Sequence, residues 1–199
     1  METVVTETSH RLELITILKA AYSGELAAGY AYRGHWKSVT NRIERERIRQ
    51  IENDEWVHRK RVGEMLDHLG AGPSKLKEMR MWLTGRAIGA LCHVIGWFLP
   101  MYFAGRLEGR NVEEYEEAAV HAGAANLKQF EGELRIMRSV EREHELFFLS
   151  AVADHRLLPL VQPIFKWGIP NGDEDPETTA VETALKDEPY KHPLSGEGD

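Results

Sequence analysis

Cysteine and proline are both scarce in this sequence. Its single cysteine, Cys92, cannot build a disulfide framework or supply a cysteine-based zinc or rubredoxin-type iron site, and it fits a reducing compartment. No proline precedes Pro73, so proline interrupts no helix in that stretch. The chain therefore has room for long helices, and it has no covalent crosslinks of its own.

Basic runs and targeting signals are also missing. The net charge is −7 at pH 7, and no run of Lys and Arg is interleaved with aromatic residues, which excludes nucleic acid as the main partner. The opening residues, METVVTETSH, are polar and acidic and resemble neither a secretory signal nor an arginine-rich transit peptide. We therefore expect a cytoplasmic protein.

Hydrophobic spacing predicts a series of helices, and no alternating strand pattern competes with them. Asn41 with Glu44 makes a capping box that opens the second helix, and Asn111 with Glu114 makes another farther along. The fold is therefore predicted to be all-α. The predicted helical segments are residues 9–36, 41–69, 75–105, 111–128 and 132–155.

The composition predicts one domain with two flanking segments. Of the residues, 42% are hydrophobic and 29% are charged, as expected for a globular protein with one substantial core. Residues 1–8 are expected to be a flexible N-terminus and residues 9–156 a helical bundle. Residues 157–199 have the composition of a proline-rich, acidic tail that is partly disordered.

Several acidic residues occur on helix faces that should be buried. In the first helix, Glu25 shares a face with Leu18 and Tyr22. The second and the last helix each carry a Glu-x-x-His motif on the apolar face, and the helix between them adds one more inward acid. The candidate metal ligands are Glu25, Glu55, His58, Glu116, Glu141 and His144.

Four buried carboxylates require a compensating positive charge. Burial of an unpaired carboxylate is costly, and neighbouring carboxylates raise one another's pKa. One Glu from each of two helices plus a Glu-x-x-His motif from each of two others is the ligand set of di-iron and di-manganese bundles. The expected cofactors are therefore two Fe ions, with Mn as the alternative. A buried polar network without metal is the competing interpretation.

Three acids compete for the ligand position on the helix before the last. Glu116 is on the same predicted face as Ala119, Glu108 precedes it by two turns on that face, and Glu117 is adjacent. Spacing alone leaves Glu108 and Glu117 open as replacements for Glu116.

Four motifs resemble the demethoxyubiquinone hydroxylases of the ferritin-like di-iron carboxylate superfamily. They are GELAAGYAYRGH, ENDEWVHRK, GRLEGRNVEEYEEAAVHA and VEREHE. The resemblance implies a ferritin-like four-helix bundle with an extra apolar helix between the second and third ligand-bearing helices, and it implies Glu116 as the ligand on the third. Part of the third motif, EEAAVHA, also resembles the alternative oxidases, which are membrane di-iron proteins.

The resemblance to the hydroxylases implies a di-iron monooxygenase of ubiquinone biosynthesis. Such an enzyme takes dioxygen and a quinone-like or other lipophilic substrate, and it needs an electron donor that the sequence does not identify. No catalytic residue beyond the metal site is implied. Two alternatives stay open: a ferritin-like Fe(II) oxidase that handles iron, which the acidic composition favours, and a quinol oxidase of the alternative-oxidase type.

Residues 87–105 carry no charge, and Arg86 and Arg106 bracket them. Interruptions by His93 and Pro100 make a membrane-spanning helix the least favoured interpretation. We expect this segment to contact the cytoplasmic membrane peripherally or to line a lipophilic pocket, with a plain buried helix or a homo-oligomer interface as the alternative.

Overall fold

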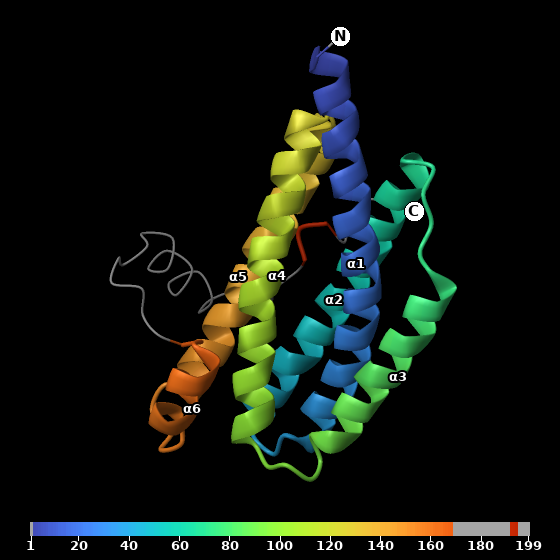
Figure 1. Ribbon diagram of the computed structural model, residues 1–199. Helices are drawn as coiled ribbons and strands as arrows, with labels where there is room; N and C mark the ends of the chain where they lie inside the picture. The colour runs from blue at the N-terminus through green and yellow to red at the C-terminus, as the bar shows by residue number, and fades with distance from the viewer. Residues whose placement is uncertain (1, 169–191, 195–199) are drawn as a thin grey trace.

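The structure is a computed structural model that describes residues 2–168 and 192–194 (Figure 1). Within these residues the regular structure is entirely α-helical, which confirms the predicted all-α class. The helices are α1 (Glu2–Ser38), α2 (Arg42–His68), α3 (Lys75–Leu91), α4 (Phe98–Ala124), α5 (Lys128–Val152) and α6 (Leu158–Phe165). The predicted bundle thus contains the extra helix, α3, between α2 and α4.

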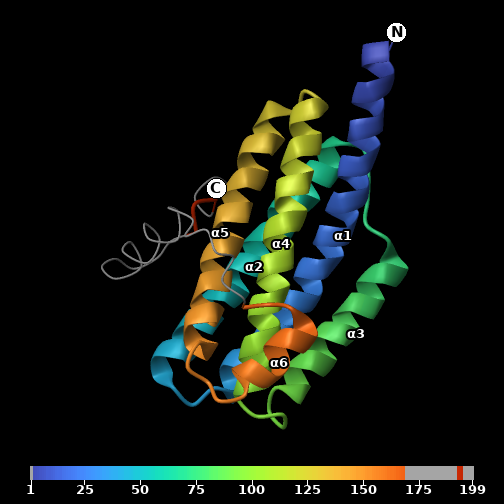
Figure 2. The same cartoon turned by 60° about the vertical axis from the view of Figure 1, so that its left-hand side comes forward.

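Four long helices, α1, α2, α4 and α5, run side by side and form the bundle (Figures 1 and 2). Apolar side chains fill it in two clusters. One contains Leu18, Met65 and Leu134 among others, and the second contains Ile51 and Phe148. On each long helix these two clusters leave an interval between them, and a buried glutamate occupies it.

Asn41 caps the beginning of α2 as predicted, while the carboxylate of Glu44 accepts from Trp97 Nε1 at 2.7 Å. The side chain of Asn41 accepts hydrogen bonds from the backbone N–H of Ile43 at 2.9 Å and of Glu44 at 3.3 Å. This pairing satisfies two N–H groups that have no partner inside the helix.

The second predicted capping box is wrong, because α4 is continuous from Phe98 to Ala124. Asn111 lies inside this helix, and its side-chain amide donates to Glu108 at 3.3 Å instead of capping an N-terminus. The helix begins earlier than predicted because Pro100 falls in its first turn, where a missing N–H costs no intrahelical hydrogen bond.

The apolar segment 87–105 is not one helix. It comprises the end of α3, a turn over residues 92–97, and the beginning of α4. Gly96 has φ +82° in that turn, a conformation that side chains with a Cβ rarely adopt. No helix among the described residues is long and apolar enough to cross a membrane.

The two flanking segments are described only in part. Helix α1 begins at Glu2, so the helix predicted from residue 9 extends through residues 2–8. In the predicted tail, α6 packs Leu158, Val161 and Phe165 on the bundle, and residues 192–194 also lie against it. The rest of the predicted tail, including its expected disorder, lies outside the described residues.

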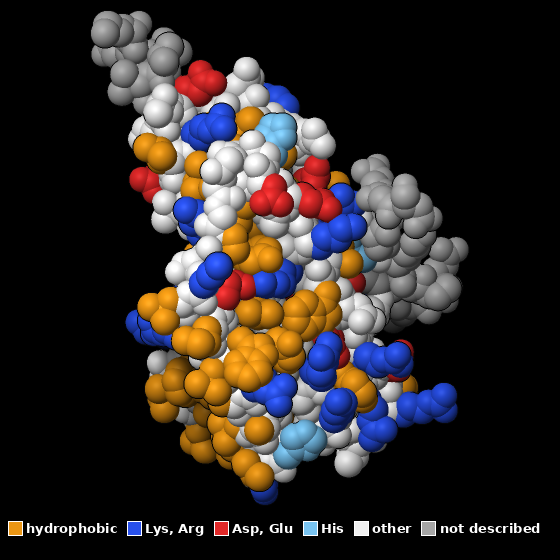
Figure 3. Space-filling model, turned by 90° about the vertical axis from the view of Figure 1, so that its right-hand side faces the viewer, with side chains coloured by type: hydrophobic (Ala, Val, Ile, Leu, Met, Phe, Trp, Pro, Cys, Tyr) orange, Lys and Arg blue, Asp and Glu red, His pale blue; other side chains and the backbone are white. Residues whose placement is uncertain are grey.

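Helix α3 lies along α1, on the outside of the bundle, and is exposed on its other side (Figures 1 and 3). Glycine permits the close contact: a Cβ atom at Gly85 would overlap the backbone of Ala27, and one at Gly34 would overlap the backbone of Gly89. The two helix backbones therefore touch directly, which fixes the position of α3.

We expect Gly85→Ala to lower the free energy of unfolding by about 1–3 kcal/mol, because the added methyl group forces α3 away from α1. Gly132→Ala in α5 is the matched control, since a Cβ there meets nothing within 4 Å, and it should stabilise by about 0.5–1 kcal/mol. Urea unfolding followed by circular dichroism measures both. Equal stability of the two variants would contradict the close contact.

Candidate metal centre

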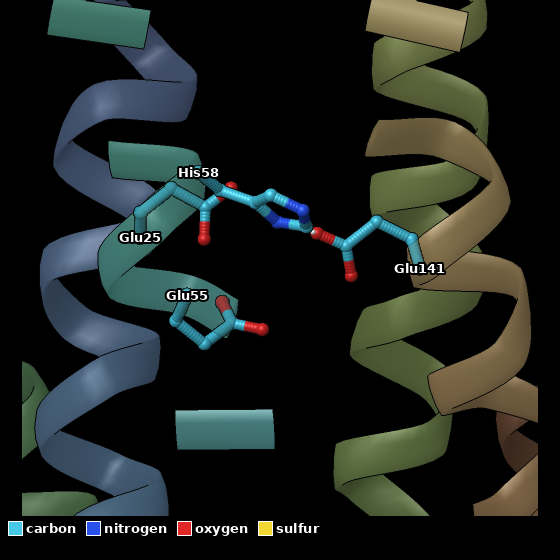
Figure 4. A group of neighbouring side chains, drawn as sticks. All are labelled: Glu25, Glu55, His58 and Glu141. Carbon is cyan, nitrogen blue, oxygen red and sulfur yellow. Dashed lines mark ion pairs between the residues drawn. The ribbon is translucent and has the colours of Figure 1, made fainter. Parts of the chain in front are cut away.

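Six buried side chains converge at the middle of the bundle from its four long helices. They are Glu25 from α1, Glu55 and His58 from α2, Glu108 from α4, and Glu141 and His144 from α5. None is more than 3% exposed. Figure 4 shows four of them, Glu25, Glu55, His58 and Glu141, with their polar groups directed toward one another.

The six residues form two adjoining groups, each able to hold one metal ion. The ligand atoms of Glu25, Glu55, His58 and Glu141 lie within 4.8 Å of one another, and so do those of Glu55, Glu108, Glu141 and His144. Glu55 and Glu141 belong to both groups, so each carboxylate could bridge two ions. The Glu-x-x-His spacing directs both side chains of a motif to the same group, because residues i and i+3 lie on the same face of a helix.

The predicted inward position of Glu116 is wrong. Its side chain is 38% exposed and forms ion pairs at 2.9 Å with Arg135 and at 3.1 Å with Arg138. It therefore lies on the surface between α4 and α5, away from the cluster. Glu117 is exposed as well.

Glu108 occupies the place predicted for Glu116, and it is fully buried. It shares the inner face of α4 with Ala104, Tyr115 and Ala122, so the inner face is shifted by one residue from the face predicted through Glu116. Spacing alone leaves Glu108 open as the replacement for Glu116, and the continuity of α4 decides between them, because the buried face follows at helical spacing from Phe98.

The cluster lacks the hydrogen bonds that buried polar atoms normally make. The atoms without a suitably oriented partner among the described residues are Glu25 Oε2, both carboxylate oxygens of Glu55 and Glu141, and Nδ1 of His58 and His144. Nδ1 of His58 is 2.8 Å from Glu141 Oε1, a spacing that two ligands of one ion can adopt. Buried polar atoms without hydrogen bonds destabilise the fold, so these oxygen and nitrogen atoms fit the role of ligands to a metal ion bound among them.

The carboxylates oppose one another electrostatically. Burial, followed by the charges of neighbouring carboxylates, raises the pKa of Glu55 and of Glu108 well above the usual range. Burial raises the pKa of Glu141 to about 8. Burial also lowers the pKa of His58 and that of His144, which keeps both imidazoles neutral and able to bind a metal ion.

Hydrogen bonds from the surrounding helices orient the carboxylates. The hydroxyl of Tyr32 donates to Glu108, and that of Tyr115 donates to Glu25. Burial raises the pKa of both tyrosines, so each hydroxyl keeps its proton as a donor. These contacts fix two of the acids in the direction of the cluster.

A mostly apolar cavity of about 470 Å³ adjoins the cluster and lies between α1, α3 and α4. Glu25 and Tyr115 line it on the side of the cluster, while Ile88, Leu99 and Phe103 line it farther out. Pockets of this size and polarity accommodate small lipophilic molecules. The cavity can therefore bring such a molecule next to the carboxylates.

Comparison with known families gives an independent result. The sequence model of the family described as ubiquinone biosynthesis protein COQ7 matches residues 13–145, which is more than half of the chain. The chain belongs to the COQ7 family. No curated protein and no solved structure matches it.

Membership in the COQ7 family confirms the predicted resemblance to demethoxyubiquinone hydroxylases and the ferritin-like fold class. COQ7 proteins are di-iron hydroxylases of ubiquinone biosynthesis, so this chain is an oxidoreductase. The matched region contains the cluster and all four helices that supply it, except for the ends of the helices.

We expect the chelator-treated protein to lose stability as the pH rises from 6.5 to 8. A carboxyl group whose pKa is raised in the fold binds more protons folded than unfolded, so stability falls until the pH passes the folded pKa. With the pKa of Glu141 at about 8, the loss should be about 2 kcal/mol or more.

Histidine offsets only part of this trend in the chosen window, because most of the effect of a lowered histidine pKa falls below the usual value of about 6.5 and the rest is complete by about pH 7.5. The melting temperature measured with excess chelator and with excess Fe(II) under nitrogen tests the expectation. A chelator-treated protein that is equally stable at both pH values would contradict it.

Proposed function

We propose that the chain binds two iron ions and hydroxylates a quinone-like lipophilic substrate with dioxygen. The observation that carries the proposal is the convergence of four Glu and two His, with unpaired ligand atoms, beside an apolar cavity. Glu25 and His58 would serve one ion, Glu108 and His144 the other, and Glu55 and Glu141 would be shared. Manganese is the alternative metal, since the same ligand types suit it.

Iron held there would supply the oxidative chemistry, in which one atom of dioxygen enters the substrate, the other leaves as water, and an external donor provides two electrons. The protein's own contribution is to orient its carboxylates and to keep them away from bulk water. Tyr32 and Tyr115 hold Glu108 and Glu25 toward the interior. Because both apolar clusters flank the site, water reaches it poorly.

His35 is suited to bind a carbonyl oxygen of the substrate. It lines the cavity, it is 3% exposed, and its Nε2 has no hydrogen-bond partner among the described residues. Burial lowers its pKa to about 4, so the ring is neutral at pH 7. The ring is held by stacking on Tyr32 and Phe148.

The outer face of α3 is suited to contact a membrane surface, from which a lipophilic substrate would enter. Its exposed apolar side chains include Leu76, Met79 and Leu83, and Val94 in the turn after α3 is exposed as well. Figure 3 shows hydrophobic side chains gathered over the lower part of this face, with Lys and Arg among them. Such a combination favours peripheral binding to an anionic bilayer.

Metal content is the first test of the proposal. The protein from iron-supplemented cells should contain about two iron ions per chain, as a site of this ligand set holds. Glu108→Ala should lose at least one of them, because it removes a ligand. Glu116→Ala should retain both, because its carboxylate is on the surface. Stoichiometric iron in Glu108→Ala but not in Glu116→Ala would contradict the ligand assignment, and an iron-free wild type would contradict the function.

Substrate hydroxylation is the second test. Reduced protein given a demethoxyquinone analogue and ¹⁸O₂ should yield a product that carries one ¹⁸O atom. His35→Phe should raise KM roughly tenfold, the effect of losing one buried hydrogen bond to the substrate, and should leave iron content unchanged. His155→Phe is the control, because His155 also stacks on a Phe but lies outside the cavity. Quinol consumption without labelled product would favour the oxidase alternative.

A further inference from the structure

The two Glu-x-x-His motifs differ in what lies behind each histidine. Nε2 of His144, the nitrogen directed away from Glu55 and Glu141, is 3.1 Å from Asp54 Oδ2. Asp54 directly precedes Glu55 in α2. The corresponding residue of α5 is Val140, which directly precedes Glu141 and is buried. An apolar side chain cannot accept a hydrogen bond, so α5 offers His58 no equivalent of Asp54.

His192 lies where that acceptor is missing. Its Nε2 is 3.0 Å from Nε2 of His58, and the two ring centroids are 5.0 Å apart. The side chain is 5% exposed, although it belongs to a segment 134 residues farther along the chain. Nδ1 of His58 faces Glu141, so His192 is on the opposite edge of the ring from the cluster. It is therefore a partner of the ligand and not itself one of the clustered ligand atoms.

Contacts on both sides hold His192 in place. The side chain of Leu194 packs into the apolar cluster that contains Leu14 and Leu18. Arg61, one turn after His58 on α2, donates to the carbonyl oxygen of Leu194 at 2.6 Å. The backbone N–H of Leu194 donates to Nδ1 of His192 at 3.0 Å. The segment is thus docked by buried apolar surface and by hydrogen bonds from the same helix that carries His58.

We infer that His192 is a positioning residue for His58, so that residues 192–194 form the outer layer of the metal centre on that side. The inference rests on the proposed function, because His58 needs an orienting partner only as a metal ligand. Histidines that bind metals through one ring nitrogen donate the proton on the other to an acceptor, which fixes the orientation of the ring. Asp54 does this for His144, and His192 does it for His58.

The positions of the ring protons on His58 and His192 predict that a metal ion changes the tautomer of His192. A metal ion on Nδ1 of His58 puts the ring proton on Nε2, which then donates to Nε2 of His192. A neutral imidazole has one acceptor nitrogen. The proton of His192 must therefore move to Nδ1, and the hydrogen bond from Leu194 N–H gives way. Metal binding and the local structure of residues 192–194 are linked through this exchange.

Binding of Zn²⁺ to the full-length protein, measured by competition with a chromophoric chelator, tests the inference. His192→Ala should lower the affinity for one of the two Zn²⁺ ions about tenfold, the lower end of the effect of removing such a partner. His192→Gln should restore the affinity, since its amide oxygen can accept from His58. His93→Ala is the matched control, because it removes an exposed imidazole in the turn before α4.

The double variant separates positioning from a general effect on folding. In a His58→Ala background, His192→Ala should cost nothing further, whereas a merely structural role would persist. Nitrogen-15 spectra of the wild type should show the His192 proton on Nε2 without Zn²⁺ and on Nδ1 with it.

Equal Zn²⁺ affinity in wild type and His192→Ala, or a His192 tautomer that Zn²⁺ leaves unchanged, would overturn the inference alone. A wild type that binds neither iron nor zinc would overturn the proposed function with it.

Discussion

The repulsion among four carboxylates inside an apolar bundle is the constraint on which the rest of this structure depends. Glu55 and Glu141 each lie in both ligand groups, at zero solvent exposure, and both apolar clusters keep water away from them. Each of the six clustered residues is a Glu or a His, and the pKa values of both histidines are lowered. A bound cation or protonation can neutralise these acids, and protonation at neutral pH requires the raised pKa values that burial produces. The bundle is therefore less stable without metal than its packing alone would allow.

The sequence predicts the parts of the site that depend on a local motif. Glu55 with His58, and Glu141 with His144, were found because three-residue spacing fixes their common direction on a helix and long apolar stripes fix the direction of the core. Glu25 was found for the same reason. In each case a single helix contains both the candidate ligand and enough apolar residues to define its inner face.

The positions of Glu108, Glu116 and His192 depend on contacts that no single motif encodes. Glu108 and Glu116 are both compatible with helical spacing, and the choice between them required the true beginning of α4. The acid-rich run around Glu116 is explained by Arg135 and Arg138 of α5, a contact between helices that local spacing does not encode. His192 is separated from His58 by more than 130 residues, and only the folded chain brings them together.

Helix α1 connects the candidate metal centre with the cavity, because it packs against α2, α3 and α4 at once. One face carries Glu25 into the bundle, and a second face, built of small residues, allows α3 to touch its backbone at Ala27 and Gly34. Large side chains there would separate the helices and widen or close the space between them. Because the cavity is bounded by α1, α3 and α4 and reaches Glu25, the same small residues that position α3 also determine which molecules can approach the carboxylates. The shape of the cavity and the packing of α3 on α1 are therefore set by one stretch of sequence, from Ala27 to Gly34.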